Sequence, residues 1–549
     1  TDEKVETRLL IWIDANAPVL RVEIDSERPV GATVHVEHWR TRERPVKTQT
    51  SDLFKNLTGP DPYPTTTSPD DILPATDGRI AWCHHNRVRE HDGFAINLAL
   101  HGLEEMIDRL PHPLTGRTFG AAVFADGAIT VGDSTLKIGP SRRQVIGIVA
   151  LTLHPSSIDA WQREIDRLVT EARQADLAAA RAEHESWWRG FWERSWLFVR
   201  SDDPAGRDAT EHVTRGYVLQ RFMNACAGRG RSPIKFNGSL FTVGKPDDPD
   251  FRRWGGPGFW FQNMRLIYWP MLACGDFDLL MPWLRMYLEQ LPLQRHRTRR
   301  YFGHGGAHFP ETITWWGAEV SAHYGWTSFA QRRRPEAECS YVTYHWQGGI
   351  ELSLILFSVF EQQLDGSFAR EFLLPIADAV TEFYDLHYPR TADGRLRIEP
   401  ASSLETWHVA SNPTPEIAGL RYLLPKLLDL PTSLVTSTLR SRWKRMLEQL
   451  PPVPVGEREG RRVILPAEWF EMKKNVENPE LYAVFPYRLF GVGKPELQLA
   501  RDTFAARRHP SHDCWSQDDA QAALLGLTET ARAFVTARAS PSASSDSRF

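Results

Sequence analysis

The hydrophobic period of the chain changes near Ser157, and this change constrains the fold more than any other feature. Residues 7–40 alternate apolar and polar side chains as strands do, and similar runs return at 118–125 and 145–153. Short breaks of Asn, Asp, Gly and Pro separate these runs. We therefore predict an antiparallel β-sandwich over residues 1–155.

Within that region, residues 42–80 are rich in Thr, Pro and Asp and are expected to form a long loop or insertion. From Ser157 to about residue 191 the spacing and the Ala, Glu and Arg content are those of a long amphipathic helix. We interpret residues 156–204 as a linker built on this helix.

Beyond about residue 205 the apolar period is helical, and loops containing Gly and Pro separate the segments. Helices are expected at 208–227, 260–274, 277–291, 346–363, 368–386, 415–429, 433–449, 496–507 and 516–537. Helices joined by long aromatic loops predict a mainly α fold, an α/α toroid over residues 205–538 whose end loops form a cleft. The small, polar residues 539–549 are expected to be disordered.

Composition narrows the class of ligand. The 549 residues include 65 Lys and Arg against 69 Asp and Glu, and a net charge of -4 offers no footprint for nucleic acid or an anionic membrane. Twenty Trp favour hydroxyl-rich ligands, because an indole combines a flat apolar face with a donor. The five Cys are scattered, without a spacing that would close a zinc site or a disulfide framework. No cofactor motif is present.

The segment WGGPGFWFQNMRLIYWP, residues 254–270, crowds aromatic side chains such as Trp254 and Trp260 around one amide, Asn263. Such faces stack on sugar rings, although a Trp-rich core is the alternative. Carboxylates set among aromatic or Ser/Thr neighbours support a sugar cleft: Glu311, Glu405, Glu468, Asp518 and Asp519.

Hydrolysis of a glycosidic bond needs a protonated acid and, on the other face of the sugar, a base or nucleophile. Glu405, beside Leu404 and near Trp407, is our candidate acid, because partial desolvation would keep it protonated. A helix cap or a surface ion pair is its alternative role. Asp518 is the preferred base and Asp519 the alternative, although both also suit the first turn of a helix.

The remaining candidates would bind substrate rather than transfer protons. Glu311 and Glu468 can accept hydrogen bonds from sugar hydroxyls, with Trp316, Trp407 and Trp515 as stacking faces. His304 and His308 have a metal-like spacing but no third ligand, so we expect His304 to make a polar contact in a loop and predict no metal.

The order of these signals over residues 150–540 resembles glycoside hydrolase family 95, the inverting α-L-fucosidase and α-L-galactosidase group with a β-sandwich and an (α/α)6 barrel. The matching segments are HESWWRGFWERSWLFV (184–199), FNGSLF (236–241), WFQNMRLIYWP (260–270), ETITWWG (311–317), SSLETW (402–407), PAEWFE (466–471) and ELYAVFPYRLFG with CWSQDDAQAALLGL (480–527). The resemblance implies Glu405 as general acid, Asn263 as an amide holding the attacking water, and Asp518 or Asp519 as base.

The chain departs from the family pattern at three places. Phe261 replaces the first of two water-holding Asn, Leu404 replaces the Pro before the acid, and the His residues of the closing loop are absent. The predicted sandwich is also shorter than that of the family, which suggests that part of the amino end lies outside this sequence. These departures leave the sugar and linkage open.

We therefore predict a glycosidase that cleaves a terminal bond of an oligosaccharide or polysaccharide with inversion, the sugar resembling fucose, galactose or another glycan terminus. A polysaccharide lyase is one alternative, for which Tyr268, Asn263, Arg265 and His304 could supply the parts. A phosphorylase and a non-catalytic glycan-binding protein are the others. A secreted or periplasmic location stays open, as does the oligomeric state.

Overall fold

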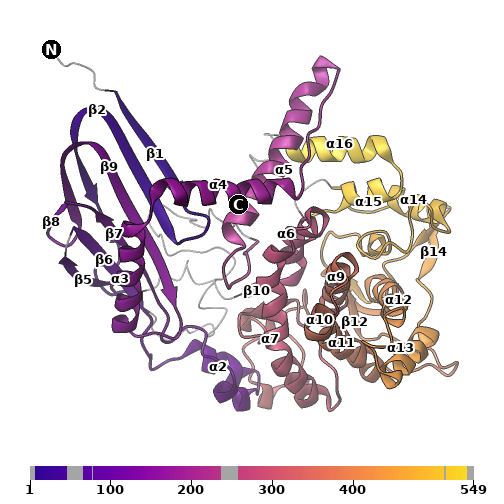
Figure 1. The fold of residues 1–549 in the computed structure, drawn as a ribbon. Coiled ribbons are helices and arrows are strands. Elements are labelled where there is room, and N and C mark those ends of the chain that lie inside the picture. The colour runs from indigo at the N-terminus through magenta and orange to yellow at the C-terminus, as the bar shows by residue number, and fades with distance from the viewer. Residues whose placement is uncertain (1–5, 46–65, 77, 237–257, 512–514, 541–549) are drawn as a thin grey trace. The chain divides into compact units, whose positions relative to one another are not determined.

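The computed structural model describes residues 6–45, 66–76, 78–236, 258–511 and 515–540. The chain divides into two compact units (Figure 1). The sheet unit takes its residues from 1–49, 61–94 and 110–195, and the helical unit takes its residues from 50–60, 95–109 and 196–549.

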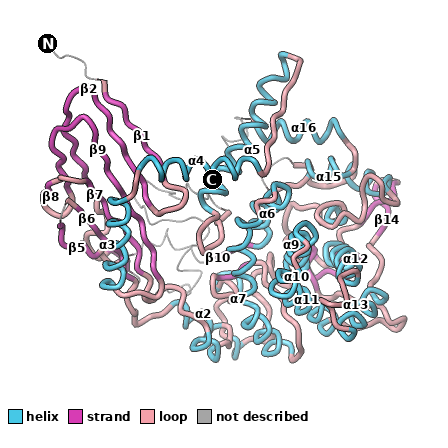
Figure 2. The backbone as a smooth tube through the Cα atoms, in the orientation of Figure 1, coloured by secondary structure: helices cyan, strands magenta, loops and turns pink. Residues whose placement is uncertain are grey.

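The sheet unit is built on one seven-stranded antiparallel sheet (Figure 2). Its strands follow the order β1 (Thr7–Ile13), β2 (Val19–His35), β9 (Thr135–Leu153), β7 (Thr118–Ala125), β6 (Arg79–His85) and β5 (Asp71–Thr76), and β8 (Ile129–Val131) pairs with β9. The short strands β3 (Arg44–Pro45) and β4 (Thr66–Thr67) form a separate pair.

Each face of this sheet buries its own apolar cluster. Val19, Ala81 and Val149 pack against Trp161 and Ile165 of helix α3 (Ile158–Gln174). The opposite face carries a second cluster that includes Ile24, Ile80, Val123 and Ile146. Because successive side chains of a strand point to opposite faces, the alternation seen in the sequence feeds both clusters.

The described strands form one principal sheet, where the sequence predicts a sandwich of two. The expectation of a loop over residues 42–80 is wrong for β5, a full member of the sheet. The expected linker helix is two helices, α3 and α4 (Leu177–Glu193). The break has a local cause, because the carboxylate of Asp176 accepts hydrogen bonds from the first backbone N–H groups of α4.

The helical unit contains helices in each expected segment, most of them with ends shifted by a few residues. They are α5 (Arg207–Ala227), α6 (Phe261–Cys274), α7 (Phe277–Phe302), α9 (Gly348–Gln363), α11 (Leu374–His387), α12 (Thr414–Leu428), α13 (Ser437–Gln449), α14 (Leu497–Ala505), α15 (Asp518–Leu524) and α16 (Thr528–Ala539). Helix α7 continues to Phe302, where the sequence predicts an end at residue 291, and the short helices α8 (Ser321–Tyr324) and α10 (Gly366–Phe368) were not expected. The short helix α2 (Gly93–Leu100) precedes them. The segment expected at 516–537 is split into α15 and α16 at Gly526, whose φ is 69°.

Helix α9 is buried along most of its length, from Gly348 to Phe360, which is typical of a helix inside a helical body. Beside it, Tyr268 of α6 stacks on Trp283 of α7 with ring centroids 4.4 Å apart. Within the described residues, no helix is long and apolar enough to cross a membrane. The expected disorder of the last residues falls on 541–549, which lie outside the described part of the chain.

Short strands between the helices position the loops that matter below. β10 (Gly258–Trp260) pairs with β11 (Thr312–Thr314) just before α6 begins. A second small sheet contains β12 (Ala401–Ser403), β13 (Trp407–Pro413), β16 (Ala467–Trp469) and β17 (Met472–Lys473), and β14 (Val455–Arg458) pairs with β15 (Arg461–Ile464).

Candidate functional site

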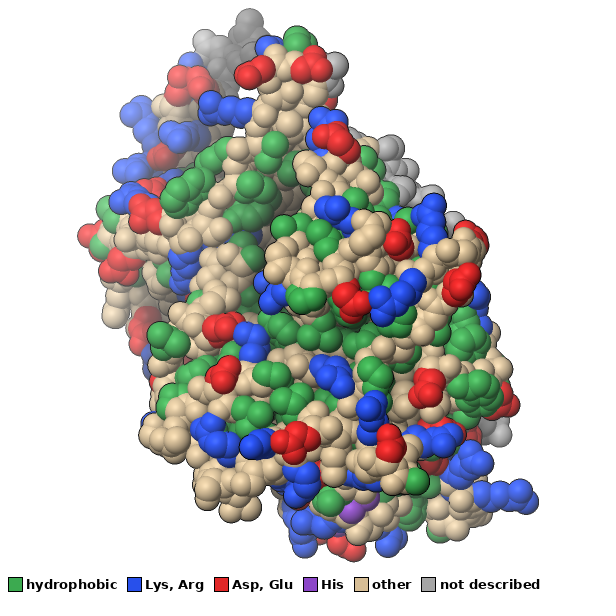
Figure 3. Space-filling model, turned by 90° about the vertical axis from the view of Figure 1, so that its right-hand side faces the viewer, with side chains coloured by type: hydrophobic (Ala, Val, Ile, Leu, Met, Phe, Trp, Pro, Cys, Tyr) green, Lys and Arg blue, Asp and Glu red, His purple; other side chains and the backbone are tan. Residues whose placement is uncertain are grey.

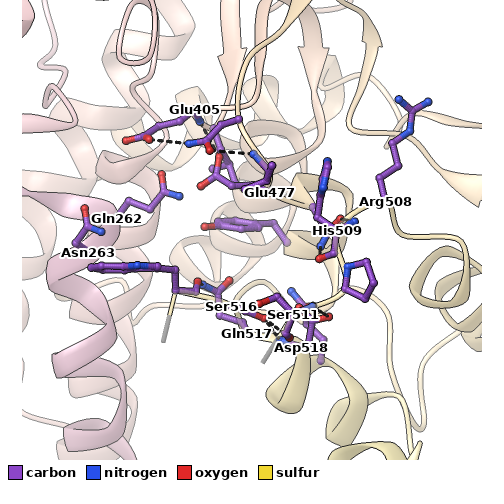
Figure 4. A pocket seen from close by; sticks show the side chains of 18 of the residues that line it. Gln262, Asn263, Glu405, Glu477, Arg508, His509, Ser511, Ser516, Gln517 and Asp518 are labelled. Atoms are coloured by element: carbon purple, nitrogen blue, oxygen red, sulfur yellow. Dashed lines mark hydrogen bonds between the residues drawn. The ribbon is translucent and has the colours of Figure 1, made fainter. Parts of the chain in front are cut away.

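A cavity of about 650 Å³ lies in the helical unit, where segments far apart in the sequence meet (Figure 4). Its polar lining includes Gln262, Asn263, Glu405, Asn475, Glu477, Tyr482, Arg508, His509, Ser511, Ser516, Gln517 and Asp518. Glu405, Asn263 and Asp518, which the sequence names as acid, amide and base, therefore line one hollow. Their roles there remain a proposal.

The first turn of α6 brings two amides to the cavity. The backbone N–H of Phe261 donates to the carbonyl of Glu311 at 2.8 Å, and that of Gln262 donates to Oε1 of Glu311 at 2.7 Å. These bonds satisfy N–H groups that a helix start leaves without a partner. Gln262 and Asn263 are thereby fixed on the cavity wall in Figure 4.

Glu311 itself lies behind this wall, with 1% of its surface exposed. Burial raises the pKa of Glu311 well above its ordinary value, and the nearby charge of Glu405 adds to the rise. The sequence predicts that Glu311 binds sugar hydroxyls. The structure places it under α6, where its carboxyl group supports the helix start and does not line the cavity.

Glu405 occupies the turn between β12 and β13, which extends into the cavity. The preceding residue, Leu404, has a φ of 54°, a conformation that the ring of proline forbids. Oε2 of Glu405 accepts a hydrogen bond of 3.1 Å from Nδ2 of Asn475. The carboxyl group is held in place by one neutral donor.

A second carboxylate, Glu477, stands directly beside Glu405 in Figure 4. Its Oε2 accepts hydrogen bonds from the backbone N–H of Glu405 at 3.0 Å and from the hydroxyl of Thr406 at 2.8 Å. Glu477 is not predicted from the sequence, because its setting, KNVENPE, lacks the aromatic and Ser/Thr neighbours that mark the other carboxylates.

Burial raises the pKa of both Glu405 and Glu477, and the charge of Glu477 raises that of Glu405 further. Arg265 acts in the opposite direction on both groups. Two carboxyl groups this close do not ionise together easily. Glu477 receives two hydrogen bonds to one oxygen and so is better suited to hold a charge than Glu405, whose carboxyl group receives one.

Asp518 lies on another wall, at the first residue of α15. Its Oδ1 accepts from Nε of Arg507 at 2.6 Å, and its Oδ2 accepts from the hydroxyl of Ser516 at 2.6 Å. These two hydrogen bonds fix the orientation of the Asp518 side chain in the cavity wall. Asp519 does not line the cavity and lies 3.3 Å from Nε of Arg538, so the structure separates the two candidates for the base.

Aromatic rings complete the wall near the amides. Phe236 makes edge contacts with Trp260 and Trp515, each with ring centroids 5.8 Å apart. Trp515 is 43% exposed, which leaves part of its face open to a ligand. Trp254, the other aromatic expected here, lies outside the described residues, as does most of the segment 236–241.

Four other expected substrate-binding residues are not among the residues that line the cavity. Trp316 is buried, and its Nε1 donates a hydrogen bond to Oδ1 of Asn97. Trp407 is buried against Phe470, with ring centroids 4.3 Å apart. Nε2 of His304 lies 3.0 Å from Nδ1 of His387, so this side chain makes a polar contact away from the cavity. Glu468 accepts from Asn412 and lines a different groove.

The parts expected for a lyase are not brought together either. Tyr268 is buried in the core and accepts a hydrogen bond from the backbone of Ile234 at 2.9 Å. Arg265 is 2.8 Å from Glu351, also in the interior. Of the four residues expected for a lyase, Asn263 lines the cavity. Among the described residues, no group of His, Cys, Asp and Glu could hold a metal ion.

Comparisons with known proteins give a match of the amino-terminal part to one family model and a likeness of fold. Residues 1–197 match a family described as a domain of unknown function (DUF5703). No curated protein matches the chain. Among solved structures, the chain is similar to one titled "Putative kojibiose phosphorylase from human microbiome", with a TM-score of 0.58, 10% sequence identity, and coverage of 99% of this chain and 72% of that chain. At this identity the likeness concerns the fold alone.

Proposed function

We propose that this chain is a carbohydrate-active enzyme that cleaves a glycosidic bond in the 650 Å³ cavity of an (α/α)6 toroid. The observation that carries the proposal is that Glu405, a carboxyl group whose pKa burial raises, and Asp518, a carboxylate paired with Arg507, line walls of one cavity. Cleavage with inversion needs an acid and a base with a nucleophile between them.

Each residue has a chemical role in this proposal. Glu405 donates its proton to the leaving glycosidic oxygen, and Asp518 accepts a proton from the attacking water. The amides of Gln262 and Asn263 orient that water, and the faces of Trp260 and Trp515 stack on the sugar. The bond from the anomeric carbon to the leaving oxygen breaks as the bond to water oxygen forms on the opposite face.

The experiment is a screen of nitrophenyl glycosides and native oligosaccharides, followed by proton NMR of the first-formed anomer. The resemblance to glycoside hydrolase family 95 supports testing terminal fucose- and galactose-like sugars first. We expect the first-formed hemiacetal to have the opposite anomeric configuration to the substrate. A product that retains the configuration would contradict the assignment of Asp518 as a base acting on water.

A phosphorylase is the second candidate, and two observations favour it. The similar solved structure carries that name, and Arg508, His509 and Ser511 present cationic and hydroxyl donors on the cavity wall. Such donors suit a phosphate oxyanion. Phosphorolysis would require inorganic phosphate and release a sugar 1-phosphate. Cleavage that is independent of phosphate favours the hydrolase, and cleavage that requires it favours the phosphorylase.

A further inference from the structure

A groove of about 1100 Å³ lies in the helical unit and shares none of its lining residues with the cavity. It is lined by Glu468 and Trp469, from the segment PAEWFE that the proposed mechanism does not use. Strand β13 joins the two places, because its first residue, Trp407, follows the turn of Glu405, and Ser411 and Asn412 near its end line the groove.

The lining of the groove includes a partly exposed indole, that of Trp469. Trp469 is 54% exposed although β16 is paired with β13, so the sheet holds its backbone while about half of its surface remains exposed. Phe490, on the same groove, packs against a buried cluster that includes Leu481 and Phe504. Rigid aromatic faces with a polar rim are well suited to the apolar face of a sugar ring.

The groove also contains a fixed acceptor for hydroxyl groups. Oε2 of Glu468 accepts from Nδ2 of Asn412 at 2.6 Å, and Oδ1 of Asn412 accepts from the backbone of Ile398 at 2.9 Å. These bonds hold the Glu468 side chain in the lining of the groove that Trp469 also lines. A carboxylate has capacity for several donors, and vicinal hydroxyls can supply two of them.

The charges of the groove balance, which favours a neutral ligand. Four carboxylates and four guanidinium groups line it. Three pairs lie within the groove at 2.6 to 3.3 Å: Arg397 with Glu399, Arg462 with Glu496 and Arg395 with Asp393. The fourth guanidinium, Arg421, donates to the carbonyls of Leu450 and Pro451. The face on which β14 lies in Figure 1 shows the same mixture in Figure 3, with hydrophobic side chains set between both signs of charge.

We propose that this groove is a second, non-catalytic binding site for a neutral oligosaccharide chain, with Trp469 as the stacking platform and Glu468 as the acceptor of its hydroxyls. The inference rests on the proposed function, because it assumes that the ligand is a glycan. It goes beyond that function in assigning a site that holds a polymer away from the bond being cleaved.

The test uses the full chain carrying E405Q, so that polymers are bound without being consumed. Native gels containing neutral galactomannan, xyloglucan or arabinogalactan, or acidic polygalacturonate, measure binding as retardation. We expect retardation by at least one neutral polymer, and a dissociation constant about 10-fold higher or more when W469A is added. E468Q should weaken binding in the same direction. W196A removes an indole that is 68% exposed elsewhere and should leave binding unchanged.

Turnover then separates this inference from the proposed function. In the chain with Glu405 intact, W469A should leave kcat/KM on a small aryl glycoside unchanged and lower it on the polymer. Equal binding by W469A and its parent, absence of retardation by every neutral polymer, or preference for polygalacturonate would overturn the groove site. Absence of cleavage in the glycoside screen would instead overturn the proposed function, since the binding measurements do not depend on it.

Discussion

Two walls of the cavity carry carboxyl groups in opposite surroundings. On one wall Glu405 and Glu477 are buried side by side, with neutral donors in contact and Arg265 acting from a distance. On the other wall Asp518 touches the guanidinium group of Arg507. Burial raises the pKa of the two carboxyl groups on the first wall, whereas the carboxylate on the second wall is held by an ion pair.

The difference shows how one small cavity can contain both an acid and a base at the same pH. Environments that push the protonation of neighbouring groups apart are the usual way to assign such roles. The variants below test whether the two walls differ in this way, and whether the pair on the first wall acts as a unit.

The largest effect is expected from E405Q. The amide keeps the shape of the side chain but has no acidic proton to give, so kcat on an unactivated glycan should fall by about 10²–10⁴-fold. Substrates with a good leaving group should lose less, because they depend less on protonation. Steady-state kinetics on both substrate types measures the contrast, and wild-type turnover of natural glycans by E405Q would show that another residue is the acid.

D518N tests the opposite wall, and D519N is its matched control. We expect D518N to lower kcat by about 10²-fold through loss of the base, while D519N, which alters a residue outside the cavity lining, changes it less than twofold. A thermal melt of D518N checks that Arg507, left without its partner, has not disturbed the fold. Equal losses in the two variants would assign the effect to the start of α15 and not to one carboxylate.

E477Q should shift a pH profile more than it lowers a rate. The acid must be protonated, so activity falls as pH rises through the pKa of Glu405. Removing the charge of Glu477 lowers that pKa, and the alkaline limb of kcat/KM should move to lower pH. We expect activity within a few fold of wild type on the acid side and about 10-fold lower on the alkaline limb. An alkaline limb at the same pH as in wild type would mean that the charge of Glu477 does not raise the pKa of Glu405.

Much of the helical unit could be predicted from the sequence, because its signal is local. A period of 3.6 with Gly and Pro at the ends located helices such as α6 and α12 to within one residue, although α7 runs on to Phe302, well past its predicted end. The strands of the sheet unit were harder to predict from the sequence. Strand β5 contains a proline and follows a polar stretch, and its place depends on pairing with β6, which the local pattern of residues does not report.

The contrast between local patterns and contacts of distant segments also explains which site residues could be predicted from the sequence. Glu405 and Asp518 were named because their neighbours in the sequence suggested a role, whereas Glu477 acts through contacts with residues about 70 positions away. Trp407 and Trp316 have the same kind of neighbours and are nevertheless buried. Residue type shows what a side chain can do, but burial is set by packing of distant segments.

The smallest expected effect is that of E311Q on thermal stability, since Glu311 supports the start of α6 behind the cavity wall. Burial raises the pKa of Glu311 in the folded chain above its unfolded value of about 4.3, so the stability it contributes is full at low pH and is lost as pH rises through the folded value. E311Q keeps an acceptor for the N–H of Gln262 and does not titrate. Between pH 5 and pH 9 the Tm of wild type should therefore fall by a few degrees more than that of E311Q. At pH 5 the kcat of E311Q should stay within about threefold of the wild-type value. Parallel Tm curves would show that Glu311 does not titrate in this range, and a large loss of kcat at pH 5 would place it in the chemistry and not under the helix.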